Sequence, residues 1–157
     1  CDLQNIWPQE WVAGDRIKLE SGHMEALHVP HRDEVSDTYG FIVQGPKKRL
    51  LFIPDIDKWE RWDTDLDSLI QMVDYALLDA TFFSEEELPG RNMAEIPNPF
   101  VLETLALSTD WSVEQKDKIY FIHFNHSNPL LDPESSATHT VQNAGYHIAR
   151  TGMQFDL

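Results

Sequence analysis

Three apolar segments of this sequence end at residues that can bind a metal ion. Val29-Pro30 precedes His31, Phe52-Ile53-Pro54 precedes Asp55, and Tyr120-Phe121-Ile122 precedes His123. Neutral imidazole and carboxylate groups bind zinc and similar ions at about 2.0–2.2 Å. Because a sheet fixes the positions of its strand ends, the repeated pattern predicts a metal site made of His31, Asp55 and His123.

Each of these residues also has an ordinary structural interpretation when it is taken alone. His31 lies in a polar loop, where Asp33 or Asp37 can accept a hydrogen bond from its ring. Asp55 has the position of a turn or helix-capping residue, and His123 that of a hydrogen-bonded histidine in the core. The metal hypothesis therefore depends on all three residues having the same setting at a strand end.

Apolar periodicity predicts strands and helices mixed along the chain. The expected strands cover residues 17–19, 24–29, 38–44, 49–54, 75–78, 118–122, 146–150 and 153–157, with a hairpin turn at 45–48. The expected helices cover residues 59–73 with Asp63 or Thr64 as cap, a segment that opens at Asn98-Pro99, residues 112–116, and residues 135–143 closed by Gly145. This mixture indicates the α/β or α+β class.

Length and charge narrow the classes of function. The 157 residues suit one domain, and 27 acidic against 12 basic residues give a net charge of −15. That charge excludes nucleic-acid binding through a broad basic surface, whereas a bound metal ion still allows an anionic substrate. No apolar run approaches the roughly 18 residues of a membrane span, and no signal peptide is visible. The cytoplasm is favoured, with the periplasm as the alternative.

The N-terminus and the tryptophans support weaker expectations. Cys1 is the single cysteine, so no internal disulfide is expected. We interpret the start as a cut or processed end, with a lipid-modified cysteine as the rival interpretation. The five tryptophans are expected to pack the core or cover sheet edges. The alternative for Trp59 and Trp62, which follow Asp55 closely, is that they line a substrate cleft.

Four segments resemble the metallo-β-lactamase superfamily, and more narrowly its branch that includes coenzyme PQQ synthesis protein B. They are residues 40–43, 52–57, 77–82 and 121–131, where Asn-x-x-Asn-Pro at 125–129 is the most branch-specific pattern. The resemblance implies a four-layer αββα sandwich. It also implies that residues 1–157 are the C-terminal part of a single domain of this kind, because the family's earlier His-x-His-x-Asp-His loop is absent from this sequence.

The resemblance assigns roles to the residues at the strand ends. His31 matches the family's third-motif histidine, Asp55 the aspartate that bridges two ions, and His123 the last histidine. His126 is a neighbour that supports the ligands or faces the substrate. The implied cofactor is a divalent metal ion, with zinc favoured and manganese or iron as alternatives.

A second pair of residues matches the proton-donating site of relatives that cleave phosphodiesters, of the ribonuclease Z type. Asp79 fits the acid of that pair, so a catalytic role is implied for it. Asn98 stands where those relatives have a histidine. Asparagine does not shuttle a proton, although it hydrogen-bonds an oxygen or caps a helix.

The resemblance implies a metal-dependent hydrolase that cleaves an ester or phosphodiester bond of a small-molecule substrate through a metal-bound hydroxide. The alternative is a non-hydrolytic accessory or binding protein of the PQQ-biosynthesis type, which the missing loop and Asn98 favour. A fragment without activity of its own is the third hypothesis. Since half a sandwich exposes a sheet face, we expect instability as an isolated monomer. The N-terminal half of the domain or a second chain is the expected partner, and a homo-oligomer is the alternative.

Overall fold

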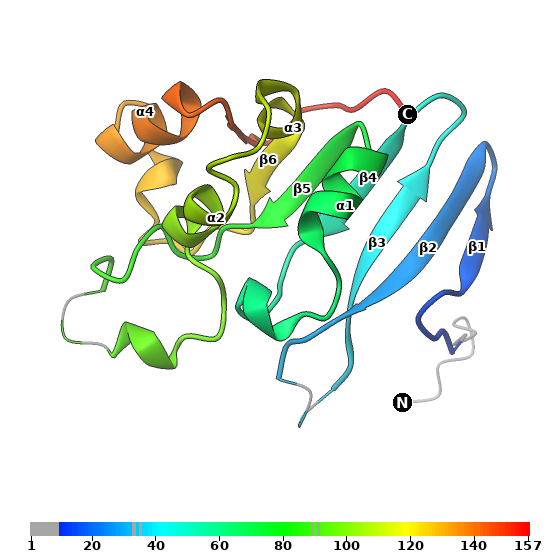
Figure 1. Ribbon diagram of the computed structural model, residues 1–157, viewed down its shortest axis with the longest axis horizontal. Helices are drawn as coiled ribbons and strands as arrows, with labels where there is room; N and C mark the ends of the chain where they lie inside the picture. Colours follow the sequence, from blue (N-terminus) through cyan, green and yellow to red (C-terminus); the bar gives the residue numbers. More distant parts are fainter. Residues whose placement is uncertain (1–9, 33, 35, 89, 91) are drawn as a thin grey trace.

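A mixed β-sheet forms the centre of the structure, a computed structural model that describes residues 10–157 apart from 33, 35, 89 and 91 (Figure 1). Within this described part, seven strands lie side by side in the order of the chain. Pairing is antiparallel from β1 to β4 and parallel from β4 to β7. The strands are β1 (Arg16–Leu19), β2 (Gly22–Val29), β3 (Thr38–Gln44), β4 (Arg49–Ile53), β5 (Tyr75–Asp79), β6 (Ile119–Ile122) and β7 (His147–Ile148).

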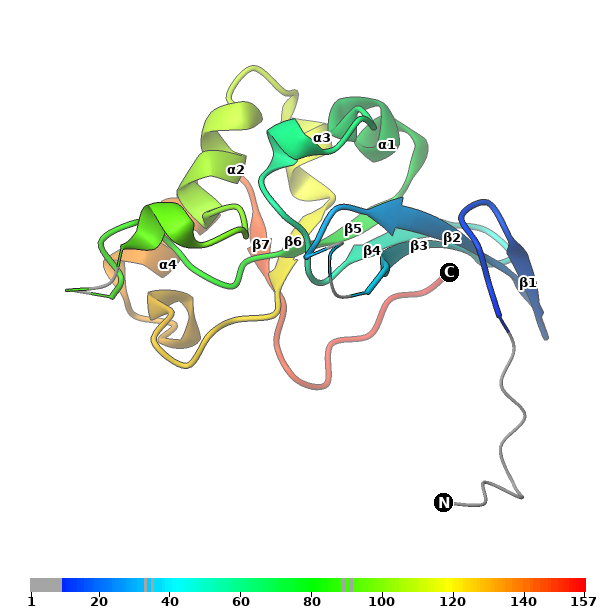
Figure 2. The same ribbon diagram turned by 90° about the horizontal axis from the view of Figure 1, so that it is seen from below.

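The helices connect the parallel strands. The α-helices are α1 (Leu66–Met72), α2 (Val101–Leu107), α3 (Val113–Asp117) and α4 (Ser136–Asn143), and the short 3-10 helices are η1 (Trp59–Arg61), η2 (Met93–Glu95) and η3 (Pro129–Leu131). Helices α1, α2 and α3 lie on one face of the sheet, and α4 lies beside β7 (Figure 2). Among the described helices, none has the length and apolar content that crossing a bilayer requires.

The core lies between the sheet and these helices. Side chains alternate between the two faces of a strand, so register partners share a face. Ile53, Leu78 and Phe121 are partners across β4, β5 and β6, and all three are fully buried. Helix α1 contributes Leu69 and Ile70 to the same cluster. Burial of one face of the sheet thus fixes where the carboxyl ends of β4, β5 and β6 lie.

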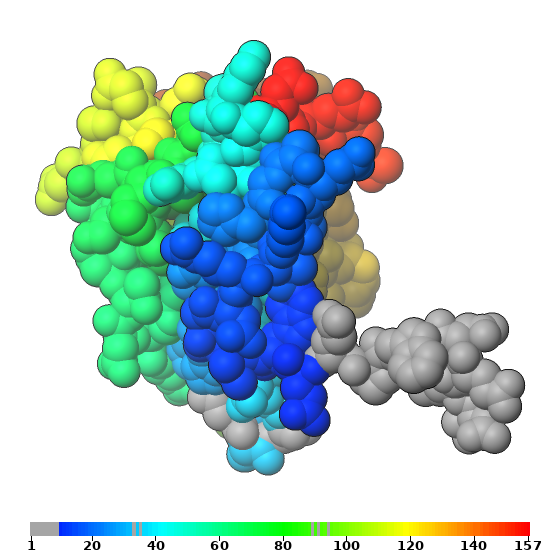
Figure 3. All heavy atoms as spheres, turned by 90° about the vertical axis from the view of Figure 1, so that its right-hand side faces the viewer, coloured from blue at the N-terminus to red at the C-terminus, as the bar shows by residue number. Residues whose placement is uncertain are grey.

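The opposite face of the sheet is apolar but less covered. Phe41, Phe52, Leu77 and Tyr120 are register partners across β3 to β6, and each is only partly buried. The first two strands lie at the edge of the molecule (Figure 3), and among the described strands β1 pairs on one side only, with β2. The sheet therefore has one well-covered face and one partly covered face.

The prediction of a strand at 153–157 is wrong. This segment forms no strand but runs along the face opposite α1–α3 (Figure 2). The Phe155 ring packs edge-on against Tyr75 at 5.1 Å and Tyr120 at 4.9 Å between ring centroids. Met153, Phe155 and Leu157 have the spacing of a strand, but aromatic packing rather than a hydrogen-bonded ladder holds the segment.

Most predicted elements are confirmed, and the two predicted helix caps near the site are wrong. Helix α1 begins at Leu66 with Asp65 as cap, rather than Asp63 or Thr64, because the Asp65 carboxylate accepts the Ser68 N–H at 3.3 Å. Helix α2 has Phe100 as its N-cap residue, so the expected cap at Asn98 is also wrong. The strands predicted at 17–19, 24–29, 38–44, 49–54, 75–78 and 118–122, the turn at 45–48, and the helices at 112–116 and 135–143 occur within two residues of the predicted bounds.

Helix α4 offers a test of local capping. The Ser135 hydroxyl accepts the Thr138 N–H at 3.1 Å and donates to the Pro129 carbonyl at 2.8 Å. Replacing Ser135 by alanine is expected to lower the free energy of unfolding by about 1 kcal/mol, which is typical of a lost N-cap. Urea unfolding followed by circular dichroism measures this cost. An unchanged midpoint would show that the cap contributes nothing.

Candidate metal centre

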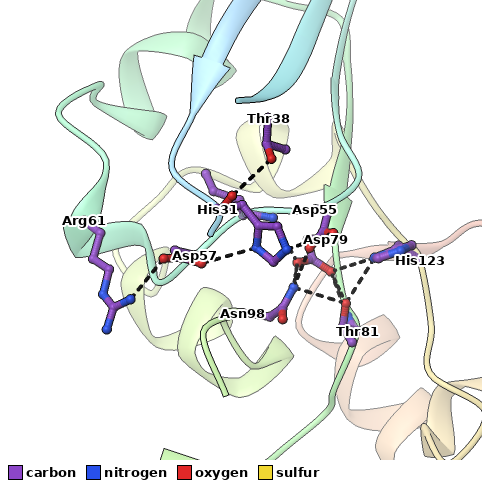
Figure 4. Close-up of polar contacts among 10 residues, drawn as sticks. His31, Thr38, Asp55, Asp57, Arg61, Asp79, Thr81, Asn98 and His123 are labelled. Atoms are coloured by element: carbon purple, nitrogen blue, oxygen red, sulfur yellow. Dashed lines mark hydrogen bonds and ion pairs between the residues drawn. The ribbon is translucent and has the colours of Figure 1, made fainter. Parts of the chain in front are cut away.

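Four acidic and histidine side chains meet at one edge of the sheet (Figure 4). Asp79 is the last residue of β5, His123 directly follows β6, and Asp55 comes two residues after β4. Because β4, β5 and β6 are parallel, their carboxyl ends lie at the same edge. Asp55, Asp79 and His123 each offer a ligand atom, and these atoms lie within 4.8 Å of one another. His31 joins them from the loop after β2.

His31 is held between two carboxylates. Its Nε2 lies 3.3 Å from Oδ2 of Asp55, and its Nδ1 lies 3.2 Å from Oδ1 of Asp57. Asp57 is fixed in turn by Arg61, whose Nη1 lies 3.0 Å from Oδ2 of Asp57, and by a backbone N–H bond to the Pro30 carbonyl at 2.7 Å. A carboxylate behind an imidazole is the usual way in which proteins orient a metal-binding histidine. Asp57 therefore has the position of a residue that orients His31.

Asp79 is fully buried and saturated with hydrogen bonds. Its Oδ1 accepts the backbone N–H and the hydroxyl of Thr81 at 2.9 and 2.6 Å. Its Oδ2 accepts from the Ile56 N–H at 3.3 Å and from Asn98 Nδ2 at 2.8 Å. Four donors match the roughly four lone-pair sites of a carboxylate, and Nδ1 of His123 makes a further, longer contact of 3.4 Å with Oδ1. The surroundings of Asp79 favour a positioning role, and the predicted catalytic role stays a prediction.

Asn98 links the two acids, which explains why it does not cap α2. Its side chain is buried, and Nδ2 donates to Oδ1 of Asp55 at 2.7 Å as well as to Asp79. The two donations from one amide group hold the two carboxylates side by side. The structure thus brings Asn98 to the site, while the catalytic role predicted for it remains untested.

His123 adopts an uncommon backbone conformation. Its φ of +62° lies in the left-handed region, which non-glycine residues seldom occupy outside constrained sites. Its Nδ1 lies 3.1 Å from the Thr81 hydroxyl and 3.4 Å from Oδ1 of Asp79. The hydrogen bond to Asp79 raises the pKa of His123, against the opposing effect of burial. About half of the side chain remains exposed, so the ring is accessible from solvent.

The electrostatics of the cluster suit a cation. Asp55, Asp57 and Asp79 bring three carboxylates together, and in the described part of the chain Arg61 is the one basic side chain, apart from the two imidazoles, that is paired with them. A divalent ion would reduce the remaining negative charge. Oxygen and imidazole donors are ligands that zinc, manganese and iron all accept.

The sequence prediction missed three supporting residues of the site: Asp57, Thr81 and Arg61. Asp57 and Thr81 each follow a predicted site residue by two positions. This repeated spacing is the signal in the sequence that points to them. Arg61 gives no such signal. His126, predicted to support the ligands or face the substrate, is exposed, and none of the contacts described for the cluster reaches its ring. Its role stays a prediction.

The chain belongs to the metallo-β-lactamase superfamily, since the model of the Beta-lactamase superfamily domain matches residues 5–101. This match includes His31, Asp55, Asp79 and Asn98. The predicted superfamily and the α+β class with a metallo-β-lactamase-like fold are thus confirmed. The prediction that residues 1–157 form the C-terminal part of one domain stays a prediction.

Two curated relatives indicate to which branch of the superfamily the chain is similar. The chain is 31% identical over 144 residues to Coenzyme PQQ synthesis protein B of Nitrosococcus oceani, covering 82% of this chain and 43% of that protein. It is 26% identical over 140 residues to the protein of the same name in Methylococcus capsulatus, covering 83% and 43%. The predicted resemblance to the branch that includes Coenzyme PQQ synthesis protein B is thereby confirmed. The chain spans less than half the length of these curated relatives.

A solved structure supports the fold. The crystal structure of Zn(2+)-bound PqqB from Methylobacterium extorquens matches with a TM-score of 0.69 at 20% identity, over 95% of this chain and 52% of that one. The match extends past residue 101 and so includes most of the sheet. At this identity the similarity establishes the arrangement of the chain rather than its chemistry.

Proposed function

We propose that this chain supplies His31, Asp55 and His123 to a divalent-metal site of a hydrolase that acts on an ester or phosphodiester bond of a small molecule. The spacing of His31 and Asp55 carries the proposal. Two ligand atoms on a tetrahedral zinc ion at about 2.0–2.1 Å lie about 3.3 Å apart. The observed distance between His31 Nε2 and Asp55 Oδ2 is 3.3 Å.

The residues around the ligands fit this function. Asp57 orients the His31 ring, Asn98 fixes one oxygen of Asp55, and Thr81 with Asp79 fixes the His123 ring. A divalent ion, when bound, supplies a Lewis acid that polarises a substrate oxygen and lowers the pKa of water. Zinc is favoured because the donors are imidazole and carboxylate, with manganese and iron as alternatives.

The site needs further ligands from outside this chain's part of the fold. Three protein ligands do not complete a pair of ions, and the curated relatives are more than twice as long as the matched region. The partly buried row of Phe41, Phe52, Leu77 and Tyr120 suits cover by a second sheet. We infer that the N-terminal half of the domain or a second chain provides both the cover and the ligands, with a homo-oligomer of this chain as the alternative.

A specific observation favours an accessory function as the second candidate. Asn98 donates to both Asp55 and Asp79, where a proton-donating histidine stands in phosphodiester-cleaving relatives. Without that histidine, protonation of a leaving group has no evident source among the residues described here. A non-hydrolytic role of the PQQ-biosynthesis type needs no such group.

Metal content together with turnover separates the two functions. The protein is loaded with zinc, manganese or iron, and assayed with p-nitrophenyl acetate and bis(p-nitrophenyl) phosphate. Close to two ions per full-length chain, with the N-terminal half of the domain present, and turnover that EDTA removes are expected of the hydrolase. One ion or none, unchanged unfolding in EDTA and no turnover of either ester would instead support the accessory function.

Replacing Asp57 by asparagine tests the orientation of His31. The amide weakens the interaction with the ring, and the affinity for zinc is expected to fall by about 10–100-fold, as for other outer-shell partners of a metal ligand. Competition with a chromophoric chelator measures the affinity. The exposed Asp110, changed to asparagine, serves as a control with the same chemistry. Equal affinities for D57N and D110N would contradict the role assigned to Asp57.

A further inference from the structure

A cavity of about 510 Å³ lies among residues of η1, α1 and α2 and the loops beside them. Its lining includes Trp59, Trp62 and Trp111, and it contains none of the residues of the candidate metal centre. Small-molecule sites typically have volumes of about 300–1,000 Å³, so the cavity has the size of a ligand site. Nothing in the proposed function uses it.

The tryptophans present apolar ring surface to this cavity. Nε1 of Trp59 donates to the Thr104 hydroxyl at 2.9 Å, and Nε1 of Trp62 donates to the His28 carbonyl at 3.0 Å. The ring centroids of Trp59 and Trp62 lie 6.4 Å apart at an angle of 40°. Because both N–H groups have partners within the protein, the two rings are held in place beside the cavity.

Four acidic side chains give this cavity a negative charge. Glu60, Asp63, Asp65 and Asp67 line the cavity, and in the described part of the chain none of them pairs with a lysine or arginine. Asp65 and Asp67 accept hydrogen bonds from neutral groups, which leaves their charge in place. The cavity is therefore both aromatic and negative, and it repels anions.

We propose that this cavity binds a small organic cation that carries an alkylated ammonium group. A cation over a tryptophan face is attracted by the ring quadrupole, and nearby carboxylates add to the attraction. Alkyl groups pack on the rings, and Leu107 adds an exposed apolar surface for the rest of the molecule. Metal ions are a poorer fit because, among the described residues, the carboxylates of this lining form no group of three whose oxygens lie close enough to share one ion.

A neighbouring contact shows the same chemistry within the chain. The Lys58 ammonium lies 3.7 Å from the ring centroid of Phe100 and 2.6 Å from a carboxylate oxygen of Glu103. Glu103 also lines the cavity, but Lys58 already neutralises it. An alkylammonium ligand would repeat this combination of ring and carboxylate with Trp62 and Asp63.

Choline and its neutral isostere 3,3-dimethylbutan-1-ol test the proposal. The indole N–H signals of the protein are followed by NMR as each compound is added. Choline is expected to shift the Trp59 and Trp62 signals to saturation, with an affinity about tenfold above that of the alcohol. Added salt is expected to weaken choline alone, because screening acts on the charge. Equal affinities for the two compounds, or no saturable shift with choline, would overturn the proposal.

Variants locate the binding in this cavity. Trp62→Leu and Asp63→Asn are each expected to weaken choline binding at least threefold, from loss of one cation–π or charge contact. Trp11→Leu and Glu85→Gln make the same changes outside the cavity and are expected to leave binding unchanged. Asp63 is exposed, so D63N tests the site even where W62L unfolds. Unchanged affinity in D63N, or an equal loss in the controls, would contradict the assignment.

Discussion

Replacing Asp55 by alanine is expected to weaken zinc binding by more than about 100-fold, since a ligand contributes more than the 10–100-fold typical of its outer-shell partners. Asp55 is the residue that connects the cluster: its carboxylate lies beside His31 and accepts from Asn98. Its loss removes the carboxylate that lies 3.3 Å from Nε2 of His31 and that shares the cluster with His123. Isothermal titration with zinc measures the effect.

The fold should survive this change, which separates metal binding from stability. Asn98 keeps its hydrogen bond to Asp79, and Asp55 itself is partly exposed. Removing one of several clustered carboxylates also relieves repulsion between like charges in the metal-free protein. Asn98 loses its hydrogen bond to Asp55, at a cost of about 1 kcal/mol that the relieved repulsion offsets. The metal-free D55A protein is therefore expected to unfold close to the wild-type midpoint, and D110N provides the control for binding. Wild-type zinc affinity in D55A would remove Asp55 from the site.

Replacing Asp79 by alanine is expected to lower the free energy of unfolding by about 3–5 kcal/mol, as for other changes that leave buried polar partners uncompensated. The buried carboxylate accepts from the backbone N–H groups of Ile56 and Thr81 and from Asn98. Alanine leaves these donors without an acceptor and opens a cavity. Urea unfolding of the metal-free protein measures the cost.

A matched control distinguishes this network from an ordinary surface acid. Asp132 is exposed, and its carboxylate accepts one backbone N–H, that of Glu134, at 2.9 Å. Asp132→Ala is expected to cost no more than about 1 kcal/mol, the usual net value of one hydrogen bond. A similar cost for D79A and D132A would show that Asp79 does not organise the site.

The strands were predictable because burial imposes a pattern on them. The run Leu50 to Ile53 and the run Ile119 to Ile122 are apolar at nearly every position, and both became strands of the parallel part of the sheet. The end of each strand is then predicted at the first polar residue after the apolar run. This is why the sequence predicts His31, Asp55 and His123 at one edge of the sheet. The structure groups Asp55 and His123 with Asp79, and His31 lies beside Asp55.

The supporting residues were harder to predict because their roles depend on distances between loops. Asn98 looked like a helix cap because Pro99 follows it, yet 43 residues separate it from Asp55, to which it donates. Asp57 received no role from the sequence, although it lies behind His31. The local sequence shows which hydrogen bonds a side chain can form with its neighbours in the chain. Tertiary contacts determine which hydrogen bonds it forms in the folded protein.

Anomalous diffraction at the zinc absorption edge, from crystals of the protein grown with zinc, tests the central claim most directly. The account predicts a peak within about 2.2 Å of a nitrogen of His31, an oxygen of Asp55 and a nitrogen of His123. A zinc peak that contacts none of these three side chains, or its absence from this edge of the sheet, would contradict the account.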